Sequence, residues 1–149
     1  AWAADLDDRD RASYRDLVDA RPRLVELFER AEPTLCHGDP RADNLVLDHT
    51  GRVVLFDWQQ MAVQFGEADL AWLSATSLDI ATRRRIDTDM VEAYGGSFDR
   101  YRLGFALPGL AVLLLAQREI SADRTRRFVA ASLSRIATAL DDLDVLGST

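Results

Sequence analysis

The chain has 149 residues, of which 48% are hydrophobic, so it has the length and the apolar share of one globular domain with a buried core. Its formal net charge of −7 argues against nucleic acid as a partner and favours a cationic substrate. The single cysteine, Cys36, excludes an internal disulfide and suits a reducing, cytoplasmic setting. With only two histidines beside it, a structural zinc site is excluded as well.

The first elements in chain order are predicted helices. Pro22 fits the first turn of a helix in which Leu24 and Phe28 share one face, and Pro33 ends that helix. A charged segment ahead of it predicts an exposed helix, with opposite charges four residues apart.

A β-hairpin is predicted next, because two short runs of β-favouring residues flank the turn-type segment 48–51. If its strands pair about Thr50 and Gly51, Asn44 and Asp57 face each other across the open end. Directly opposed residues of an antiparallel pair have Cα atoms about 4.5–5.5 Å apart. Two short oxygen-bearing side chains at that separation can share one magnesium ion, whose other ligands are water and phosphate.

The spacing before the hairpin points to phosphoryl transfer. Asp39 and Asn44 have the interval of the kinase catalytic loop H-R-D-x-x-x-x-N, with Gly38 in place of the arginine. That chemistry needs one carboxylate to orient and deprotonate the attacking hydroxyl, and two oxygen-bearing side chains to hold magnesium on the nucleotide phosphates. Asp39, Asn44 and Asp57 supply these three groups.

The rest of the chain is predicted to be helical, over 69–78, 83–94 and 103–116 and in a last amphipathic helix capped by Ser121. The basic run 83–85 is predicted to be a solvated helix start, with contact to phosphate as the alternative. The helical spacing of Phe128 predicts a core position, and Trp72 is compatible with a core position or with a substrate contact. The apolar segment 103–116 is too short for a bilayer, which needs about 20 residues, and is predicted to be a buried, kinked core helix. The expected fold class is therefore α+β, mainly α, a helical bundle with one small catalytic hairpin.

Within this single domain, 1–149, three parts are expected. The leading helices occupy about 1–33, the catalytic loop, the hairpin and the metal-binding aspartate occupy 34–60, and a helical subdomain occupies 61–149.

The tripeptide His-Gly-Asp at 37–39, with Asn44 and then Asp57, resembles the aminoglycoside phosphotransferase and choline kinase group, small-molecule relatives of the protein kinases. The tripeptide Asp-Trp-Gln at 57–59 and the segment 66–71 more particularly resemble the bacterial branch of phosphotransferases close to the ecdysteroid-kinase-like proteins. The combined pattern is specific, although each piece alone occurs in many chains.

The resemblance implies a role for each matching residue. Asp39 is the catalytic base, and Asn44 and Asp57 are the magnesium ligands. Arg41 stands where protein kinases often carry a lysine, and a guanidinium there can neutralise charge on the transferred phosphoryl group. A surface arginine in a loop is the alternative.

Two further residues are implied to support the catalytic loop rather than to react. His37 resembles the histidine that braces this loop. Asp69 resembles a residue that buttresses the loop from the following helix, and it can equally be the cap of that helix.

The implied activity is ATP-dependent phosphorylation of a hydroxyl on a small molecule, with Mg²⁺ and ATP as cofactors and with neither nucleic acid nor membrane as partner. The chain contains no lysine and no glycine-rich phosphate loop, both of which kinase-like enzymes use to hold the nucleotide. It is therefore interpreted as the C-terminal lobe of a protein-kinase-like fold, with the N-terminal nucleotide lobe absent from this chain and little activity expected without it.

Two other functions are compatible with the sequence. One is a non-catalytic kinase-like module that binds a metabolite or a protein. A weaker one is a metal-dependent hydrolase that uses His37, Asp39 and Asp57, although such sites generally have more ligands.

Overall fold

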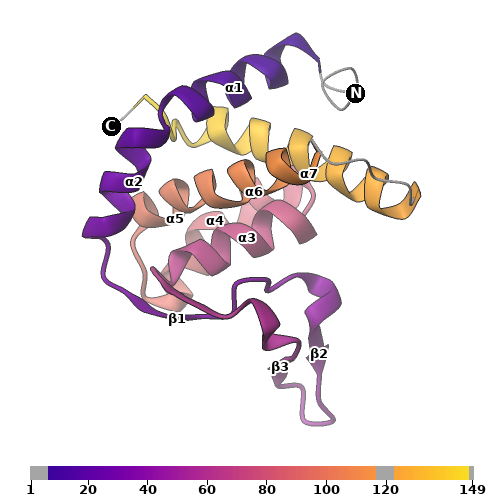
Figure 1. Ribbon diagram of the computed structural model, residues 1–149. Helices are drawn as coiled ribbons and strands as arrows, with labels where there is room; N and C mark the ends of the chain where they lie inside the picture. Colours follow the sequence, from indigo (N-terminus) through magenta and orange to yellow (C-terminus); the bar gives the residue numbers. More distant parts are fainter. Residues whose placement is uncertain (1–6, 117–122, 148–149) are drawn as a thin grey trace.

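A computed structural model describes residues 7–116 and 123–147 and confirms the mainly helical α+β fold class (Figure 1). Two short 3₁₀-helices, η2 (Ala42–Asn44) and η3 (Trp58–Gln60), flank the predicted hairpin. The helices are α1 (Asp8–Asp19), α2 (Arg21–Arg30), α3 (Glu67–Ser77), α4 (Ile80–Tyr94), α5 (Phe98–Gly104), α6 (Ala106–Ala116) and α7 (Asp123–Asp142). The strands are β1 (Thr34–Cys36), β2 (Leu45–Leu47), β3 (Val53–Leu55) and β4 (Ala62–Gln64).

The hydrophobic core surrounds α3, which contacts α4, α5, α6 and α7. Small residues let α5 approach α3 closely, since a Cβ atom on Gly104 would lie only 2.9 Å from the Cβ atom of Ala71. Tyr101 and Phe105 fill the space beside this contact and are fully buried, with their rings edge-to-face at 5.2 Å. Packing of this kind fixes the position of α3, on which the candidate site is built.

The segment 103–116 forms parts of two helices instead of one kinked helix. The break at Phe105 has a local cause in Pro108, which has no N–H for the carbonyl group of Gly104 and whose ring would clash with that carbonyl in a continuous helix. Pro108 instead lies in the first turn of α6, where no N–H is needed. Over residues 7–116 and 123–147, none of the helices has both the length and the apolar character needed to cross a membrane.

Some of the other helix boundaries lie where the local sequence predicts them. α2 has Pro22 in its first turn, as predicted. α4 begins at Ile80, three residues before the predicted start, because the Asp79 carboxylate caps it by accepting a hydrogen bond from the backbone N–H of Thr82 at 2.9 Å. Ser121, the predicted cap of the last helix, lies outside the described residues.

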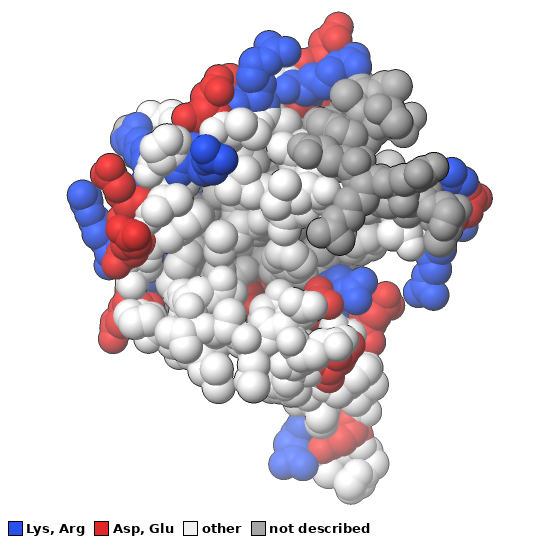
Figure 2. All heavy atoms as spheres, viewed as in Figure 1, with Lys and Arg blue, Asp and Glu red and all other residues white. Residues whose placement is uncertain are grey.

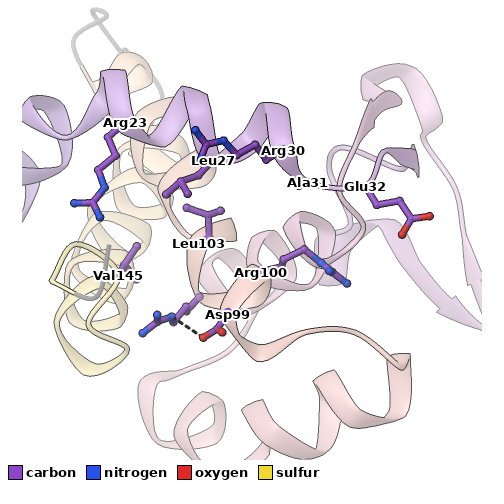
Figure 3. Close-up of a pocket in the computed structure, with 10 residues that line it drawn as sticks. Arg23, Leu27, Arg30, Ala31, Glu32, Asp99, Arg100, Leu103 and Val145 are labelled. Atoms are coloured by element: carbon purple, nitrogen blue, oxygen red, sulfur yellow. Dashed lines mark ion pairs between the residues drawn. The ribbon is translucent and has the colours of Figure 1, made fainter.

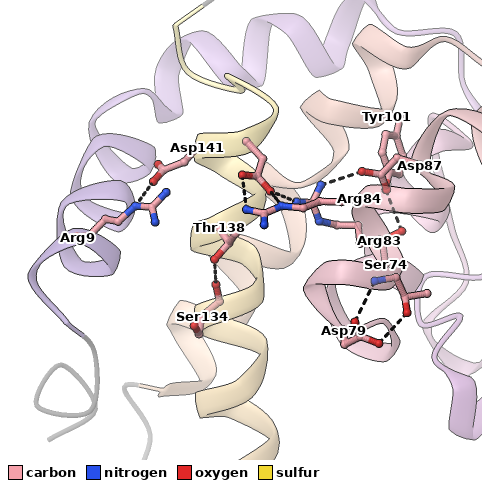
Figure 4. Close-up of polar contacts among 12 residues, drawn as sticks. Arg9, Ser74, Asp79, Arg83, Arg84, Asp87, Tyr101, Ser134, Thr138 and Asp141 are labelled. Carbon is pink, nitrogen blue, oxygen red and sulfur yellow. Dashed lines mark hydrogen bonds and ion pairs between the residues drawn. The ribbon is translucent and has the colours of Figure 1, made fainter.

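A buried charge network ties α4 to α5 and α7 (Figure 4). Arg83, of which only 2% is exposed, pairs with Asp87 at 2.8 Å and with Asp142. The Tyr101 hydroxyl donates to Asp87 and lies 2.9 Å from Ser74 Oγ. Burial raises the pKa of Asp87, against the lowering by Tyr101 and Arg83. Arg83 is thus a core residue and not part of a solvated helix start.

Two antiparallel pairs of strands are nested in the chain. β1 pairs with β4, with Leu35 opposite Val63, and β2 pairs with β3, with Val46 opposite Val54. The β2–β3 hairpin was predicted, whereas the β1–β4 pair was not. Because one pair encloses the other in sequence, the loop from β1 to β2 and the segment from β3 to β4 meet where the two pairs adjoin. All the candidate residues before Asp69 lie on these two connections.

Candidate active site

The loop between β1 and β2 is anchored on the first turn of α3 by Asp69. The Asp69 carboxylate accepts hydrogen bonds from the backbone N–H groups of His37 at 2.6 Å and Gly38 at 3.0 Å. The N-cap position of α3 is Gly66, so Asp69 does not cap this helix. Its two oxygen atoms instead fix the backbone immediately before Asp39.

His37 links this loop to the segment that carries Asp57. Its side chain is buried, its Nε2 lies 2.8 Å from the carbonyl oxygen of Phe56, and its Nδ1 accepts from the backbone N–H of Asp39 at 3.3 Å. This pattern fits a ring with its proton on Nε2. The Trp58 ring lies 4.6 Å from the imidazole, centroid to centroid. Since both ring nitrogens have protein partners, His37 is a poor candidate for a metal ligand, which argues against the hydrolase hypothesis.

Two structural constraints at position 38 together require glycine. The backbone of Gly38 has φ +83°, in the left-handed region, and a Cβ atom there would lie 2.1 Å from the carbonyl oxygen of Gln60. An arginine at this position, as in the protein-kinase loop, does not fit. The close approach lets the loop and the segment before β4 pack directly against each other.

The Asp39 carboxylate is held by three side chains from two parts of the chain. Trp72 Nε1, on α3, donates to Oδ1 at 2.9 Å. Arg41 Nε lies 2.9 Å from Oδ1 and 3.1 Å from Oδ2, and Asn44 Nδ2 lies 3.2 Å from Oδ2. The side chain keeps 18% of its surface exposed. Asp39 is therefore an oriented carboxylate that a substrate can still reach.

The Asn44 side chain is oriented by contacts with the same loop. Its Nδ2 also donates to the Asp39 carbonyl oxygen, at 2.8 Å, which leaves the amide oxygen as its free ligand atom. The predicted opposition of Asn44 and Asp57 is wrong by one residue, because the Asn44 carbonyl accepts from the backbone N–H of Phe56 at 3.2 Å. The cause is the turn, which centres on Thr50 and not on the bond after it, so that Leu47 pairs with Val53.

The three-residue turn is fixed by Asp48. Its carboxylate accepts from the Thr50 hydroxyl at 2.6 Å and from the backbone N–H of Arg52 at 3.0 Å, while Gly51 takes φ +82°. These hydrogen bonds, that of Thr50 first, lower the pKa of Asp48 to about 2. A turn with a left-handed glycine at its third position is a common hairpin connection.

Asp57 follows β3 in an unusual backbone conformation, φ 65° and ψ 58°. Left-handed backbone is uncommon outside glycine, although aspartate tolerates it better than most residues, and it concentrates at functional sites. The Asp57 side chain is exposed, and among the described residues it has neither a hydrogen bond nor an ion pair. The chain changes direction here and enters η3, so Asp57 lies at the corner beside the His37–Phe56 contact.

The helix α7 also contacts the loop between β1 and β2. Phe128 lies under Arg41, with the guanidinium carbon 5.5 Å from the ring centroid, and Arg124 lies 3.7 Å from Asp43. The Arg41 guanidinium is therefore placed by an aromatic face as well as by Asp39. Phe128 is half-buried and packs against the hydrophobic core, as its amphipathic spacing predicted.

The donor set fits magnesium. One amide oxygen, that of Asn44, and one carboxylate, that of Asp57, are ligands that Mg²⁺ accepts together with phosphate and water. No group of three or more His, Cys, Asp or Glu side chains suited to a metal occurs among residues 7–116 and 123–147.

Cys36 ends β1 directly before His37 but does not have the properties of a nucleophile. Its thiol is buried, with Sγ 3.5 Å from the carbonyl oxygen of Phe65. Burial, followed by the charge of Asp69, raises the pKa of Cys36 to about 11. A thiol with such a pKa is protonated at neutral pH, so Cys36 acts as a small buried residue.

A pocket of about 510 Å³ lies away from this cluster, between α2, α5 and the segment after α7 (Figure 3). Leu27, Leu103 and Val145 give it apolar walls, and four arginines and two acidic residues also line it. Its Arg100 is engaged by the buried Glu67 at 2.7 Å. None of the predicted site residues lines this pocket, so the pocket is separate from the candidate cluster.

The cluster combines an oriented carboxylate, an amide oxygen and a second carboxylate, which are the groups that phosphoryl transfer requires. The chain belongs to the phosphotransferase enzyme family, whose family model matches residues 1–105. The matched region includes all four strands and α3, and it ends before α6 and α7. No curated protein and no solved structure matches the chain.

Sequence reasoning missed two contributors to the site. Trp72 was left undecided between core and contact, although its position three residues after Asp69 on one helix places both side chains on the same face. Nothing in the sequence indicates that Phe128 contributes to the site, because about ninety residues separate it from Arg41 and its own segment contains no site motif.

Proposed function

We propose that this chain is the catalytic lobe of an ATP-dependent phosphotransferase that phosphorylates a hydroxyl of a small molecule. The observation that carries the proposal is the Asp39 carboxylate, which is oriented by Trp72, Arg41 and Asn44 and is still partly exposed. Within the family, the Asp-Trp-Gln tripeptide at 57–59 supports a place near the bacterial ecdysteroid-kinase-like branch.

In this proposal Asp39 accepts a hydrogen bond from the substrate hydroxyl and takes its proton as the oxygen attacks the γ-phosphorus, while the bond from that phosphorus to the β–γ bridging oxygen breaks and ADP leaves. Because Asp69 fixes the backbone at His37 and Gly38, the carboxylate keeps its direction during the reaction. Arg41 stands beside it with a charge that can stabilise the transferred phosphoryl group. Its Nε is engaged by Asp39, so the remaining N–H groups are the ones that can reach phosphate.

Asn44 and Asp57 are the proposed magnesium ligands. Bound Mg²⁺ would neutralise charge on the β- and γ-phosphates. Asn44 offers its amide oxygen because Asp39 occupies its amide nitrogen, and the left-handed backbone at Asp57 turns the chain at the point where the second ligand is needed. His37 keeps the two connections together through the Phe56 carbonyl.

The strand region supports the proposal that an N-terminal nucleotide lobe of the same protein covers this chain. A two-stranded hairpin is marginally stable by itself, yet β2–β3 projects from the helices (Figure 1). Both of its faces are exposed, since Val46 and its neighbour Leu47 are 49% and 71% exposed. In Figure 2 the charged residues gather mainly at the margins of the molecule and at the hairpin, and leave a broad uncharged area on this face.

We call the exposed large apolar residues of the strand region the strand patch. Its members come from both pairs of strands and from the segment between them. They are Leu35, Val46, Leu47, Val53, Val54, Phe56, Trp58, Met61 and Val63. A concentration of apolar side chains of this kind is typical of a covered interface. Such a lobe would also supply the lysine that this chain lacks.

A cytoplasmic location is part of the same proposal. ATP is a cytoplasmic phosphate donor, and the reduced, buried thiol of Cys36 is compatible with that compartment.

The test is transfer of the γ-phosphoryl group of Mg·ATP to a panel of hydroxyl compounds, followed by ³¹P NMR, with the protein that contains both lobes. We expect a new phosphate monoester with at least one compound class and no transfer by Asp39→Ala. Tight binding of a compound or protein without any transfer would support the non-catalytic module instead.

A further inference from the structure

We propose that Trp72 is a positioning residue for the catalytic base, because its indole N–H holds the Asp39 carboxylate in the direction that proton transfer requires. This inference rests on the proposed function, in which Asp39 is the base. It goes beyond that function by assigning a role to a residue outside the catalytic loop.

The first argument is the placement of Trp72 on a rigid element. α3 packs against four other helices, and its buried Ala71 and Ala75 flank Trp72 on the core side. The Trp72 carbonyl accepts a hydrogen bond from the Thr76 hydroxyl at 2.7 Å. Asp69 and Trp72 are one turn apart, so a single helix fixes both the backbone before Asp39 and the carboxylate of Asp39 itself.

The second argument is the division of donors between the two carboxylate oxygens. Trp72 donates to Oδ1 at 2.9 Å, and Asn44 donates to Oδ2 at 3.2 Å. With a different donor on each oxygen, rotation of the carboxylate about its Cβ–Cγ bond breaks both hydrogen bonds. Arg41 bridges the two oxygens from the same loop and cannot by itself define that rotation.

The third argument is chemical. An indole N–H donates only and carries no charge, so Trp72 neither accepts the substrate proton nor attracts the nucleotide phosphates. Arg41 and Asn44 both have a second task in the proposed reaction, toward phosphate and magnesium. Among the described residues that donate to Asp39, Trp72 has no second task in the proposed reaction. The carboxylate is therefore oriented before the nucleotide binds.

The test begins with the indole N–H resonances of the ¹⁵N-labelled chain, where Trp72→Phe identifies the Trp72 signal. In Asp39→Ala we expect this signal to move upfield and its hydrogen exchange to accelerate by roughly tenfold or more. The matched control is Trp58, whose Nε1 donates to the Leu55 carbonyl oxygen at 3.1 Å and whose signal should keep its hydrogen-bonded position. An unchanged Trp72 signal in Asp39→Ala would overturn the proposal.

The second readout is kinetic and uses the protein that contains both lobes. Trp72→Phe keeps an aromatic ring but removes the N–H, so kcat should fall by about tenfold while KM for ATP stays the same. An unchanged kcat, or a loss confined to KM, contradicts positioning. If the NMR response is present but the wild-type protein transfers no phosphate, the proposed function fails and the contact is only structural.

Discussion

Asp69 is the residue whose replacement separates a loop brace from a helix cap. Its carboxylate accepts backbone hydrogen bonds from His37 at 2.6 Å and Gly38 at 3.0 Å. Hydrogen bonds to charged groups contribute about 1.5–3 kcal/mol each, so loss of both in Asp69→Ala should lower the free energy of unfolding by about 3–6 kcal/mol. Loss of a helix cap costs only about 1 kcal/mol.

The assay is urea unfolding followed by circular dichroism, with Asp89→Ala as the control. Asp89 is an exposed aspartate on α4, and its removal should change the stability little. Asp69→Asn keeps one acceptor oxygen and should lose about half as much stability as Asp69→Ala. Because Asp69→Asn removes one of the two acceptor oxygens for the loop backbone, the amide signals of His37 and Gly38 should also shift in this variant.

A loss of 1 kcal/mol or less in Asp69→Ala, together with unchanged amide signals of His37 and Gly38, would refute this reasoning. The same result would show that the contacts of Asp69 with the loop contribute no more than a helix cap does, and it would leave the position of Asp39 without its main anchor.

Three further predictions concern the surroundings of the site. Gly38→Ala should lower stability by about 1–3 kcal/mol in thermal unfolding, because its Cβ atom would lie 2.1 Å from the Gln60 carbonyl oxygen, and wild-type stability would contradict this. The pKa of Asp48 is lowered from 3.8 to about 2, so its stabilising effect is complete above pH 4 and is lost as the pH falls toward 2; an NMR titration midpoint near 4 would be evidence against the turn contacts. The pKa of Cys36 is raised from 9.0 to about 11, so iodoacetamide at pH 8 should alkylate the native thiol about 100-fold more slowly than the unfolded one, and equal rates would show that the thiol is accessible.

The parts of the fold that depend on local signals could be predicted from the sequence. The β2–β3 hairpin follows from β-favouring runs around a turn segment, and the end of α4 follows from Gly95, which takes φ 73°. The register was wrong by one residue because two- and three-residue turns are both compatible with the segment 48–51. Only the hydrogen bonds of Asp48 select the longer turn.

The non-local parts could not be predicted. β1 and β4 are three residues long and pair across a gap of more than twenty residues, so no short-range pattern indicates them. Arg83 looked like part of an exposed basic run, and its burial depends on Asp142, which lies 59 residues away in the chain. The catalytic spacing of Asp39 and Asn44 was visible, but the contact of Asp39 with Trp72 on α3 requires the folded arrangement.

The most direct test of the central claim is the kinetics of Asp39→Ala in the protein that includes the proposed N-terminal lobe, with ATP affinity measured in parallel. A general base contributes about 10²–10⁴-fold to the rate, so kcat should fall by that factor while the Kd for ATP stays within about twofold of the wild-type value. Near-normal turnover by Asp39→Ala would contradict the assignment of Asp39 as the base and, with it, the proposed mechanism.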